Sequence, residues 1–418
     1  MKIKEFFQKH VGLILFSTLI TSYAFVCMTK YCFASAMVFI VDEGYMTSFQ
    51  TGLITAAFWL VYAVTQLFGG FIADKWHPEW LITLGLITAG ISNVLVYLFY
   101  DNYILTLIIW MLNAFFQFGV WPSVFRIISA MYSGNKLTTA MMIATLASPA
   151  GLMMSYAVAA VVPKWQGNFV ISFVGLFLMA VVWTIAVRVS GGYFKSLNLN
   201  NRSKVAVADV GTYDSNVGTV KLLISSGLLF AFLIAFFRAV IENAKTVLPT
   251  MINESYSEVD PVLSTFITLI PLFCSAAAPI ISSILSKKFK NELKVAVTIF
   301  AVMLPISLVT LMLGRISYWW MIASMAAVTF GASCVTFFII TLVATKFNKW
   351  GKGATVAGLL NCFTALGNVA ASALITWIAE RFSWAVSMGS VVVMIAISLI
   401  LAATELPIWS RFKKKHNV

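Results

Sequence analysis

Twelve long apolar runs constrain the fold of this chain more than any other feature of the sequence. A helix needs about 20 mostly apolar residues to cross a hydrocarbon core about 30 Å thick. The runs do not alternate between apolar and polar residues, so we expect an all-α membrane protein with twelve transmembrane helices, not a barrel. The predicted spans are 11–41, 49–73, 80–100, 103–131, 137–162, 167–190, 222–250, 260–286, 293–314, 317–345, 352–379 and 383–406.

Composition excludes a water-soluble chain. Of the 418 residues, 61% are hydrophobic and 10% are charged, whereas soluble domains carry about 25% charged residues. The lipid bilayer is therefore the first expected partner. The opening Lys2, Lys4 and Lys9 precede an apolar run that is too long for a secretory signal and lacks a small-residue cleavage site, so we interpret this run as the first span.

Basic residues predict the orientation of these spans. On the side of the N-terminus lie 21 of the 28 Lys and Arg residues, whereas the opposite side holds only Lys164, Arg315 and Arg381. Basic loops stay in the cytoplasm, so we expect both termini there, in an inner or plasma membrane. The net charge of +13 is then a signal of topology, and it requires no nucleic-acid partner.

A polar stretch between the sixth and seventh spans divides the chain into two halves. The interval of 15 residues from Lys136 to Gly151 recurs from Lys352 to Gly367, which indicates weak internal symmetry. Two similar bundles usually enclose a site near the middle of the membrane. The expected domains are a six-helix bundle at 1–190, a cytoplasmic linker at 191–221, and a second six-helix bundle with a basic tail at 222–418.

The sequence offers no enzyme site. The five cysteines lie in apolar runs without a C-x-x-C pair, and the three histidines lie in tails or loops. We find no Gly-rich phosphate loop, intramembrane Ser/His pair or paired carboxylates. We therefore expect no enzymatic activity, no metal and no cofactor.

Ionisable residues inside the spans carry the functional signal, because each costs about 2.5 to 3.5 kcal/mol at the centre of a bilayer. Four are positive and one is negative: Lys30, Arg126, Arg238, Lys245 and Glu242. This excess of positive charge is tolerable where a water-filled cavity holds an anion. The sequence therefore predicts a binding site for a small anionic solute.

Lys30 and Arg238 are the strongest candidates for binding the anion, with Lys245 beside them. They lie at comparable depths in the two halves, so we expect them to face one central site. Arg offers a flat fork and Lys a point charge, which suits phosphate or carboxylate. In the alternative interpretation, Lys30 reaches toward the surface and Arg238 pairs with Glu242 one helical turn away.

Three further polar residues are expected to line the cavity. Tyr23 precedes Lys30 by two helical turns on the same face, and Tyr62 and Gln66 share a face of the second span. In the alternative interpretation, the tyrosines are packing residues whose hydroxyl groups bond to a neighbouring helix.

Glu242 limits how transport is coupled to an energy source. It is the only carboxylate well inside a predicted span, and Arg238 and Lys245 favour its charged form. A carboxylate that stays charged is a poor proton carrier. We therefore favour exchange of one anion for another, or passive uniport, over proton symport.

The loop after the second span resembles a known motif. Residues 69–75 read Gly-Gly-Phe-Ile-Ala-Asp-Lys, which is similar to the cytoplasmic loop signature of the major facilitator superfamily. The resemblance implies the major facilitator fold, and it implies that Asp74 and Lys75 lock helix ends in one access state. We expect Arg126 to take part in this gate, either as a structural clamp on Asp74 or by contacting the cargo.

Four segments also resemble the organophosphate:phosphate antiporter family within that superfamily. The segments are Lys30 to Met37, Trp121-Pro122 with Arg126, Phe237-Arg238, and Gly367 to Ala373. The resemblance of the first segment implies that Lys30 occupies the place of one phosphate-binding arginine. The resemblance of the third implies that Arg238 occupies the place of the other.

Three positions depart from the family pattern. Lys30 stands in place of an arginine, Gln66 in place of a lysine, and no histidine is present near Ser148. Fewer positive groups predict a less highly charged anion than the usual sugar or glycerol phosphates.

The predicted function is alternating-access transport of a small organic anion, a phosphorylated metabolite exchanged for phosphate, by a monomer. Two alternatives remain open. One is a proton- or sodium-coupled importer of sugar acids or other carboxylates, and the other is a sensor that binds an anion without moving it.

Overall fold

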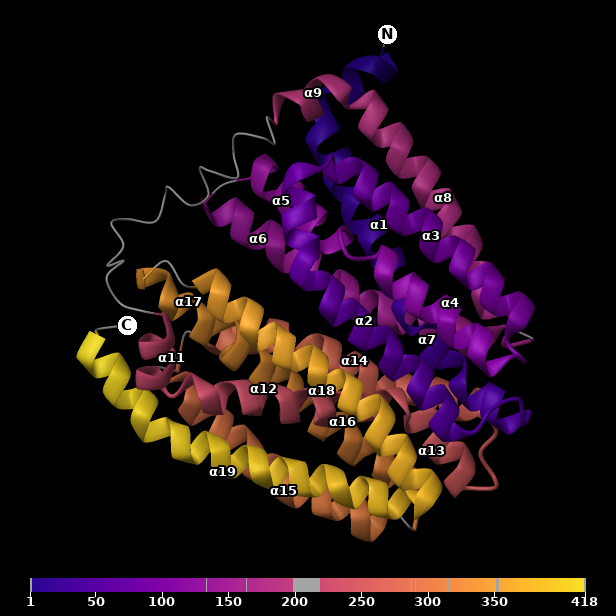
Figure 1. Cartoon of the computed structure of the whole chain (residues 1–418), viewed down its shortest axis with the longest axis vertical. Coiled ribbons are helices and arrows are strands. Elements are labelled where there is room, and N and C mark those ends of the chain that lie inside the picture. Colours follow the sequence, from indigo (N-terminus) through magenta and orange to yellow (C-terminus); the bar gives the residue numbers. More distant parts are fainter. Residues whose placement is uncertain are drawn as a thin grey trace. The chain divides into compact units, whose positions relative to one another are not determined.

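The computed structural model describes residues 2–132, 134–162, 164–197, 219–286, 288–289, 291–314, 316–350 and 353–416 (Figure 1). In this part of the chain the regular structure is entirely helical, which confirms the predicted all-α class. The first half contains α1 (Lys2–Asp42), α2 (Ser48–Lys75), α3 (Pro78–Phe99), α4 (Tyr103–Phe116), α5 (Val120–Met131), α6 (Gly134–Thr145), α7 (Ala147–Val161), α8 (Gly167–Val189) and α9 (Gly191–Ser196). The second half contains α11 (Thr219–Ser226), α12 (Leu228–Asn243), η1 (Ala244–Thr246), α13 (Leu248–Ser255), α14 (Pro261–Ser286), α15 (Glu292–Leu313), α16 (Tyr318–Val335), η2 (Thr336–Val343), α17 (Ala344–Lys346), η3 (Phe347–Trp350), α18 (Gly353–Arg381) and α19 (Trp384–His416).

The chain divides into two compact units, and α1 and α2 belong partly to each. The first unit comprises Met1–Ala36 and Val61–Asp209, and the second comprises Met37–Leu60 and Val210–Val418. The end of α1 and the start of α2 therefore pack with the C-terminal helices. The first six residues of the predicted linker form α9, and residues 198–218 lie outside the described residues.

Each unit has its own apolar core. In the first unit, α3 packs along α8, and the core includes Leu86, Leu176 and Trp183. In the second unit, α19 runs beside α15 (Figure 1), and α12 packs against α18. Close packing of apolar side chains and dispersion contacts hold these helices together, since lipid is as apolar as the helices themselves.

Eleven helical stretches among the described residues are long and apolar enough to cross a membrane. They correspond to all the predicted spans except 222–250. That segment consists of α11, α12, η1 and α13, and its longest helix, α12, has 16 residues. The seventh predicted span is therefore a discontinuous helix.

Local chemistry explains the two breaks in this span. Gly227 between α11 and α12 has φ of 81°, in the left-handed region that favours glycine. Pro249 lies in the first turn of α13, where its missing N–H is tolerated, and it disfavours continuation of the helix before it. The Thr246 hydroxyl donates to the Asn243 carbonyl at 2.8 Å and occupies an acceptor at the end of α12.

Candidate functional site

Lys30 is the central cation of the first unit. It lies on α1 with 6% of its surface exposed. Its Nζ atom donates to the Tyr62 hydroxyl at 2.9 Å and lies 4.2 Å from the Tyr62 ring centroid and 5.8 Å from that of Tyr23. The faces of these rings attract a cation electrostatically. The structure therefore brings three predicted site residues together.

Gln66 and Tyr23 connect this group to the break between α4 and α5. The Gln66 side chain donates to the Phe118 carbonyl at 3.2 Å, and the Tyr23 ring lies 5.2 Å from that of Trp121. Phe118 belongs to the turn between the two helices. Gln66 is thus hydrogen-bonded to this turn. Trp121, whose ring packs against Tyr23, was not among the predicted lining residues.

Lys30 has no acidic partner within the described part of the chain. No described carboxylate lies within 4.0 Å of its Nζ atom, whereas Arg238 and Lys245 each pair with an acid. A buried ammonium group is costly unless a counter-charge compensates it. The first unit therefore presents a buried cation whose counter-ion must come from elsewhere.

The second unit contains three charged residues around the break after α12. Arg238 pairs with Glu242 one turn away, as the alternative interpretation predicts, and also donates to the Thr336 hydroxyl. Lys245 of η1 donates to Glu242 at 3.1 Å. With two positive groups and one negative group, the cluster carries one net positive charge.

Hydroxyl groups from three further helical elements hold this cluster. The Ser333 hydroxyl donates to Glu242 at 2.8 Å, and Lys245 donates to the Ser275 hydroxyl at 2.6 Å. Ser275 lies on α14, Ser333 lies at the end of α16, and Thr336 opens η2, a stretch of π-helix. Sequence reasoning missed these small hydroxyl residues, although π-helical turns are frequent at functional sites.

Two glycines position the cation-bearing helices in an equivalent way. A Cβ atom on Gly151 of α7 would lie 2.5 Å from the Met28 backbone nitrogen, two residues before Lys30. A Cβ atom on Gly367 of α18 would overlap the Phe236 carbonyl, two residues before Arg238. Only glycine permits this approach of two backbones. The two glycines that close the repeated interval thus make equivalent close approaches, one in each unit.

Of the predicted gate, only Arg126 has a described side chain. Its guanidinium donates to the Trp76 carbonyl at 3.0 Å, just beyond the end of α2. A cation at this place interacts favourably with the negative end of the helix dipole. The side chains of Asp74 and Lys75 lie outside the described residues, so their predicted contact with Arg126 stays a prediction.

Acidic residues of the second unit bind the first residues of α2. Glu254 accepts from the Ser48 hydroxyl at 2.6 Å and from the Trp384 indole at 2.7 Å. Glu380 accepts from the Phe49 backbone nitrogen at 2.9 Å, at the start of α2. These contacts hold 37–60 in the second unit, and sequence reasoning missed them because the partners are more than 200 residues apart in the chain.

Glu405 is a second buried carboxyl group, which sequence reasoning did not single out. The predicted last span ends at 406, but α19 continues to His416 and buries Glu405 completely. Neither of its carboxyl oxygens has a hydrogen-bond partner within the described residues. An unpaired carboxyl group in an apolar environment is costly.

Replacing Glu405 by methionine is expected to raise the free energy of unfolding by about 1 to 3 kcal/mol, the usual cost of a buried unsatisfied polar group. Glu292→Met is the matched control, because Glu292 accepts from Trp409 at 3.1 Å and from Lys413 at 2.9 Å. That control should destabilise the protein. Denaturation in mixed micelles, followed by tryptophan fluorescence, measures both effects, and loss of stability in Glu405→Met would show that the carboxyl group has a stabilising partner.

Known proteins resemble this chain in sequence and in fold. The membrane sensor protein UhpC of Escherichia coli (strain K12) is 28% identical over 132 residues, which are 32% of this chain and 29% of that protein. A probable hexose phosphate transport protein of Chlamydia trachomatis serovar D is 26% identical over 125 residues, which are 30% of this chain and 27% of that protein. The matched stretch therefore spans less than a third of the length of these curated relatives.

Solved structures extend the resemblance of the fold to nearly the whole chain. A POT family transporter crystallised with 5-aminolevulinic acid has a TM-score of 0.73 at 16% identity, with 94% of this chain and 96% of that chain covered. At this identity the match concerns the fold alone. The family model described as Major Facilitator Superfamily matches residues 19–362. The chain therefore belongs to the Major Facilitator Superfamily, a family of membrane transport proteins and not of enzymes.

Proposed function

We propose that this protein is an alternating-access transporter of a small phosphorylated organic anion of the hexose phosphate class, and that it exchanges this anion for inorganic phosphate. The observation that carries the proposal is the buried Lys30, which has two aromatic neighbours and no described acidic partner within 4.0 Å. A phosphate group supplies the missing counter-charge and accepts hydrogen bonds from an ammonium group. Probable hexose phosphate transport proteins are among the relatives, which supports this substrate class over the less highly charged anion that the three departures from the family pattern predict.

The second unit contributes the other cationic group in this proposal. Glu242 neutralises one of its two basic neighbours, so one positive charge remains available to an anion. The Arg238 guanidinium is a flat fork that matches two phosphate oxygens. We propose that both cationic groups take part in binding the anion, and that the two units rock around it during the transport cycle.

Anion exchange is favoured over proton symport because three polar groups donate to the Glu242 carboxylate. Arg238, Lys245 and Ser333 all donate to its carboxylate, and Lys245 is itself fixed by Ser275. Protonation of Glu242 would lose these charge-assisted bonds. In the proposed exchange cycle, Glu242 is therefore a structural counter-ion to Arg238 and Lys245.

Counterflow in proteoliposomes tests the exchange. Vesicles loaded with phosphate are expected to take up labelled glucose 6-phosphate, whereas vesicles loaded with chloride take up little. Uptake that is independent of internal phosphate but follows a proton or sodium gradient would overturn the exchange mechanism and favour the coupled importer. Labelled gluconate, a sugar acid, serves as the carboxylate comparison in the same vesicles.

A second candidate function is anion sensing without transport, which the similarity to the sensor protein UhpC favours. In a sensor that does not pass through a transport cycle, the contacts of Glu254 and Glu380 with the start of α2 would have to persist. Binding of glucose 6-phosphate without any flux into loaded vesicles would support this function. Measurable counterflow would exclude it.

The orientation and membrane are part of the proposal. We propose that both termini lie in the cytoplasm of a bacterial inner membrane and that the monomer is the functional unit. The excess of basic residues in loops on the side of the N-terminus supports this orientation. Labelling of single cysteines placed in the tail after α19 and in the loop between α1 and α2, from each side of the membrane, tests it.

A further inference from the structure

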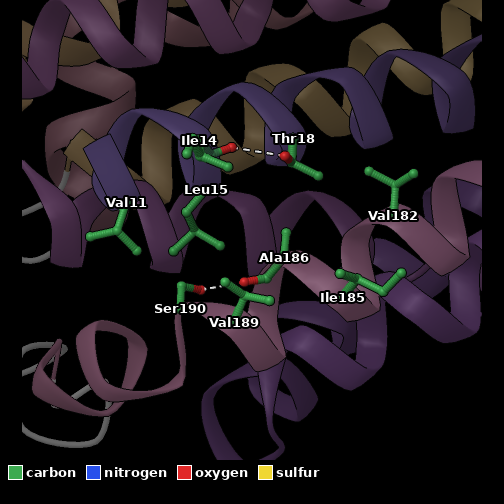
Figure 2. A pocket seen from close by; sticks show the side chains of 9 residues that line it. All are labelled: Val11, Ile14, Leu15, Thr18, Val182, Ile185, Ala186, Val189 and Ser190. Atoms are coloured by element: carbon green, nitrogen blue, oxygen red, sulfur yellow. Dashed lines mark hydrogen bonds between the residues drawn. The ribbon is translucent and has the colours of Figure 1, made fainter. Parts of the chain in front are cut away.

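A groove lies between α1 and α8 in the first unit, away from the cationic group of Lys30. Figure 2 shows its nine lining residues, and its volume is about 340 Å³. An engineered apolar cavity of about 150 Å³ is large enough to bind benzene. This groove therefore has room for a longer hydrocarbon chain. Its lining consists of Val11, Ile14, Leu15 and Thr18 from α1, Val182, Ile185, Ala186 and Val189 from α8, and Ser190 directly after α8.

The groove has no side-chain proton free to donate to a polar solute. Its only two hydroxyl groups are bonded to their own helices: Thr18 donates to the Ile14 carbonyl at 2.8 Å, and Ser190 donates to the Ala186 carbonyl (Figure 2). Every other lining side chain is aliphatic. Water or a sugar would lose hydrogen bonds in such a groove. An apolar chain loses none.

The groove faces the lipid. Val182, Ile185 and Val189 are 45%, 54% and 63% exposed on a helix long and apolar enough to span the membrane. In a bilayer, acyl chains contact exposed apolar side chains of this kind. The occupant is therefore a component of the membrane.

Basic side chains flank one end of the groove. Arg188 directly precedes the lining residues Val189 and Ser190, and Lys195 follows on α9. Both basic residues are exposed, and neither pairs with a described carboxylate. Tyr193 of α9 contacts α1 at Gly12, beside the groove, where a Cβ atom would lie 3.2 Å from its hydroxyl. Residues 167–197 contain no Asp or Glu. The charge at this end therefore complements an anionic headgroup.

We propose that this groove is a binding site for an anionic phospholipid, with one acyl chain between α1 and α8 and the phosphate headgroup at Arg188 and Lys195. Basic sites between transmembrane helices on the cytoplasmic side bind anionic headgroups in this manner. The site is separate from the cationic groups proposed to bind the transported anion, so it stands whether or not the protein is a transporter.

Photolabelling of the full-length protein in nanodiscs tests the proposal. The probe is phosphatidylglycerol with a diazirine in its acyl chain, and peptide mass spectrometry locates the adducts. Adducts are expected on 11–18 and 182–190, and unlabelled phosphatidylglycerol should compete for them better than phosphatidylcholine. Equal competition by the two lipids would overturn the headgroup site.

Two variants remove the groove and the charge separately. Ala186→Phe fills the groove, and Arg188→Gln with Lys195→Gln removes the basic end without changing the packing. Each should reduce labelling at this site by about tenfold, since each basic residue near the surface contributes to anionic lipid binding. The controls Ala403→Phe and Lys414→Gln with Lys415→Gln make the same changes at exposed positions of α19. Undiminished labelling in both Ala186→Phe and the Arg188→Gln, Lys195→Gln variant would contradict the proposal. An equal loss of labelling in the controls would contradict it too.

Discussion

Replacing Lys30 by glutamine is expected to reduce counterflow of glucose 6-phosphate by about 10- to 100-fold. The variant keeps a polar side chain beside Tyr62 but loses the buried positive charge that no described acid compensates. A hydrogen bond to a charged group is worth about 1.5 to 3 kcal/mol, and each 1.4 kcal/mol is a factor of ten in binding. Initial rates in proteoliposomes at several substrate concentrations measure the effect.

The matched control for Lys30 is Lys136→Gln. Lys136 belongs to the same unit, but its side chain is exposed on α6, so its removal should change the rate little. Lys30→Arg keeps the charge and should retain more activity than Lys30→Gln. Equal rates for Lys30→Gln and the wild-type protein would show that the ammonium group does not contact the anion.

Replacing Gly367 or Gly151 by alanine is expected to reduce transport by about 100-fold. At Gly367, the new Cβ atom would overlap the Phe236 carbonyl and lie 2.7 Å from the Ala239 Cβ atom. At Gly151, it would lie 2.6 Å from the Ala24 carbonyl. Backbone atoms cannot rotate away, so α12 or α1 must move, and a misplacement of about 1 Å can cost about 100-fold in rate.

Gly358→Ala is the control for these substitutions. Gly358 lies on α18, the same helix as Gly367, but apart from its own helix backbone and chain neighbours nothing in the described part of the chain lies within 4 Å of the position of a Cβ atom there. Alanine should be neutral there or favour the helix by up to about 1 kcal/mol. The expected signature of Gly367→Ala is a folded protein with weak substrate binding, measured by thermal unfolding and titration. Wild-type affinity in Gly367→Ala would show that the close approach does not position Arg238.

The spans could be predicted from sequence because the thickness of the bilayer dictates the length of an apolar helix. The break in 222–250 was missed, since the segment is long and apolar enough overall to be taken for one span, although Gly227 and Pro249 mark the two interruptions. The length of α19 was underestimated because the predicted span ends at 406, where the bilayer no longer requires apolar residues. Helices continue beyond the membrane where caps and neighbouring helices support them.

The candidate site was predictable only where its chemistry is local. The pair of Arg238 and Glu242 follows from a separation of four residues on one helix. The contact of Lys30 with Tyr62 joins α1 to α2, and the contact of Ser275 with Lys245 joins α14 to η1. Such contacts depend on how helices pack. A serine or threonine inside an apolar span gives no signal of its own, because it usually bonds to its own helix.

The central claim is that the two cationic groups recognise the phosphate, and titration calorimetry of the purified protein tests it most directly. We expect glucose 6-phosphate to bind, glucose to bind at least about 100-fold more weakly, and both Lys30→Gln and Arg238→Gln to lose the preference for the phosphorylated sugar. Equal affinity for glucose and glucose 6-phosphate in the wild-type protein, or an unchanged preference in both variants, would contradict the account.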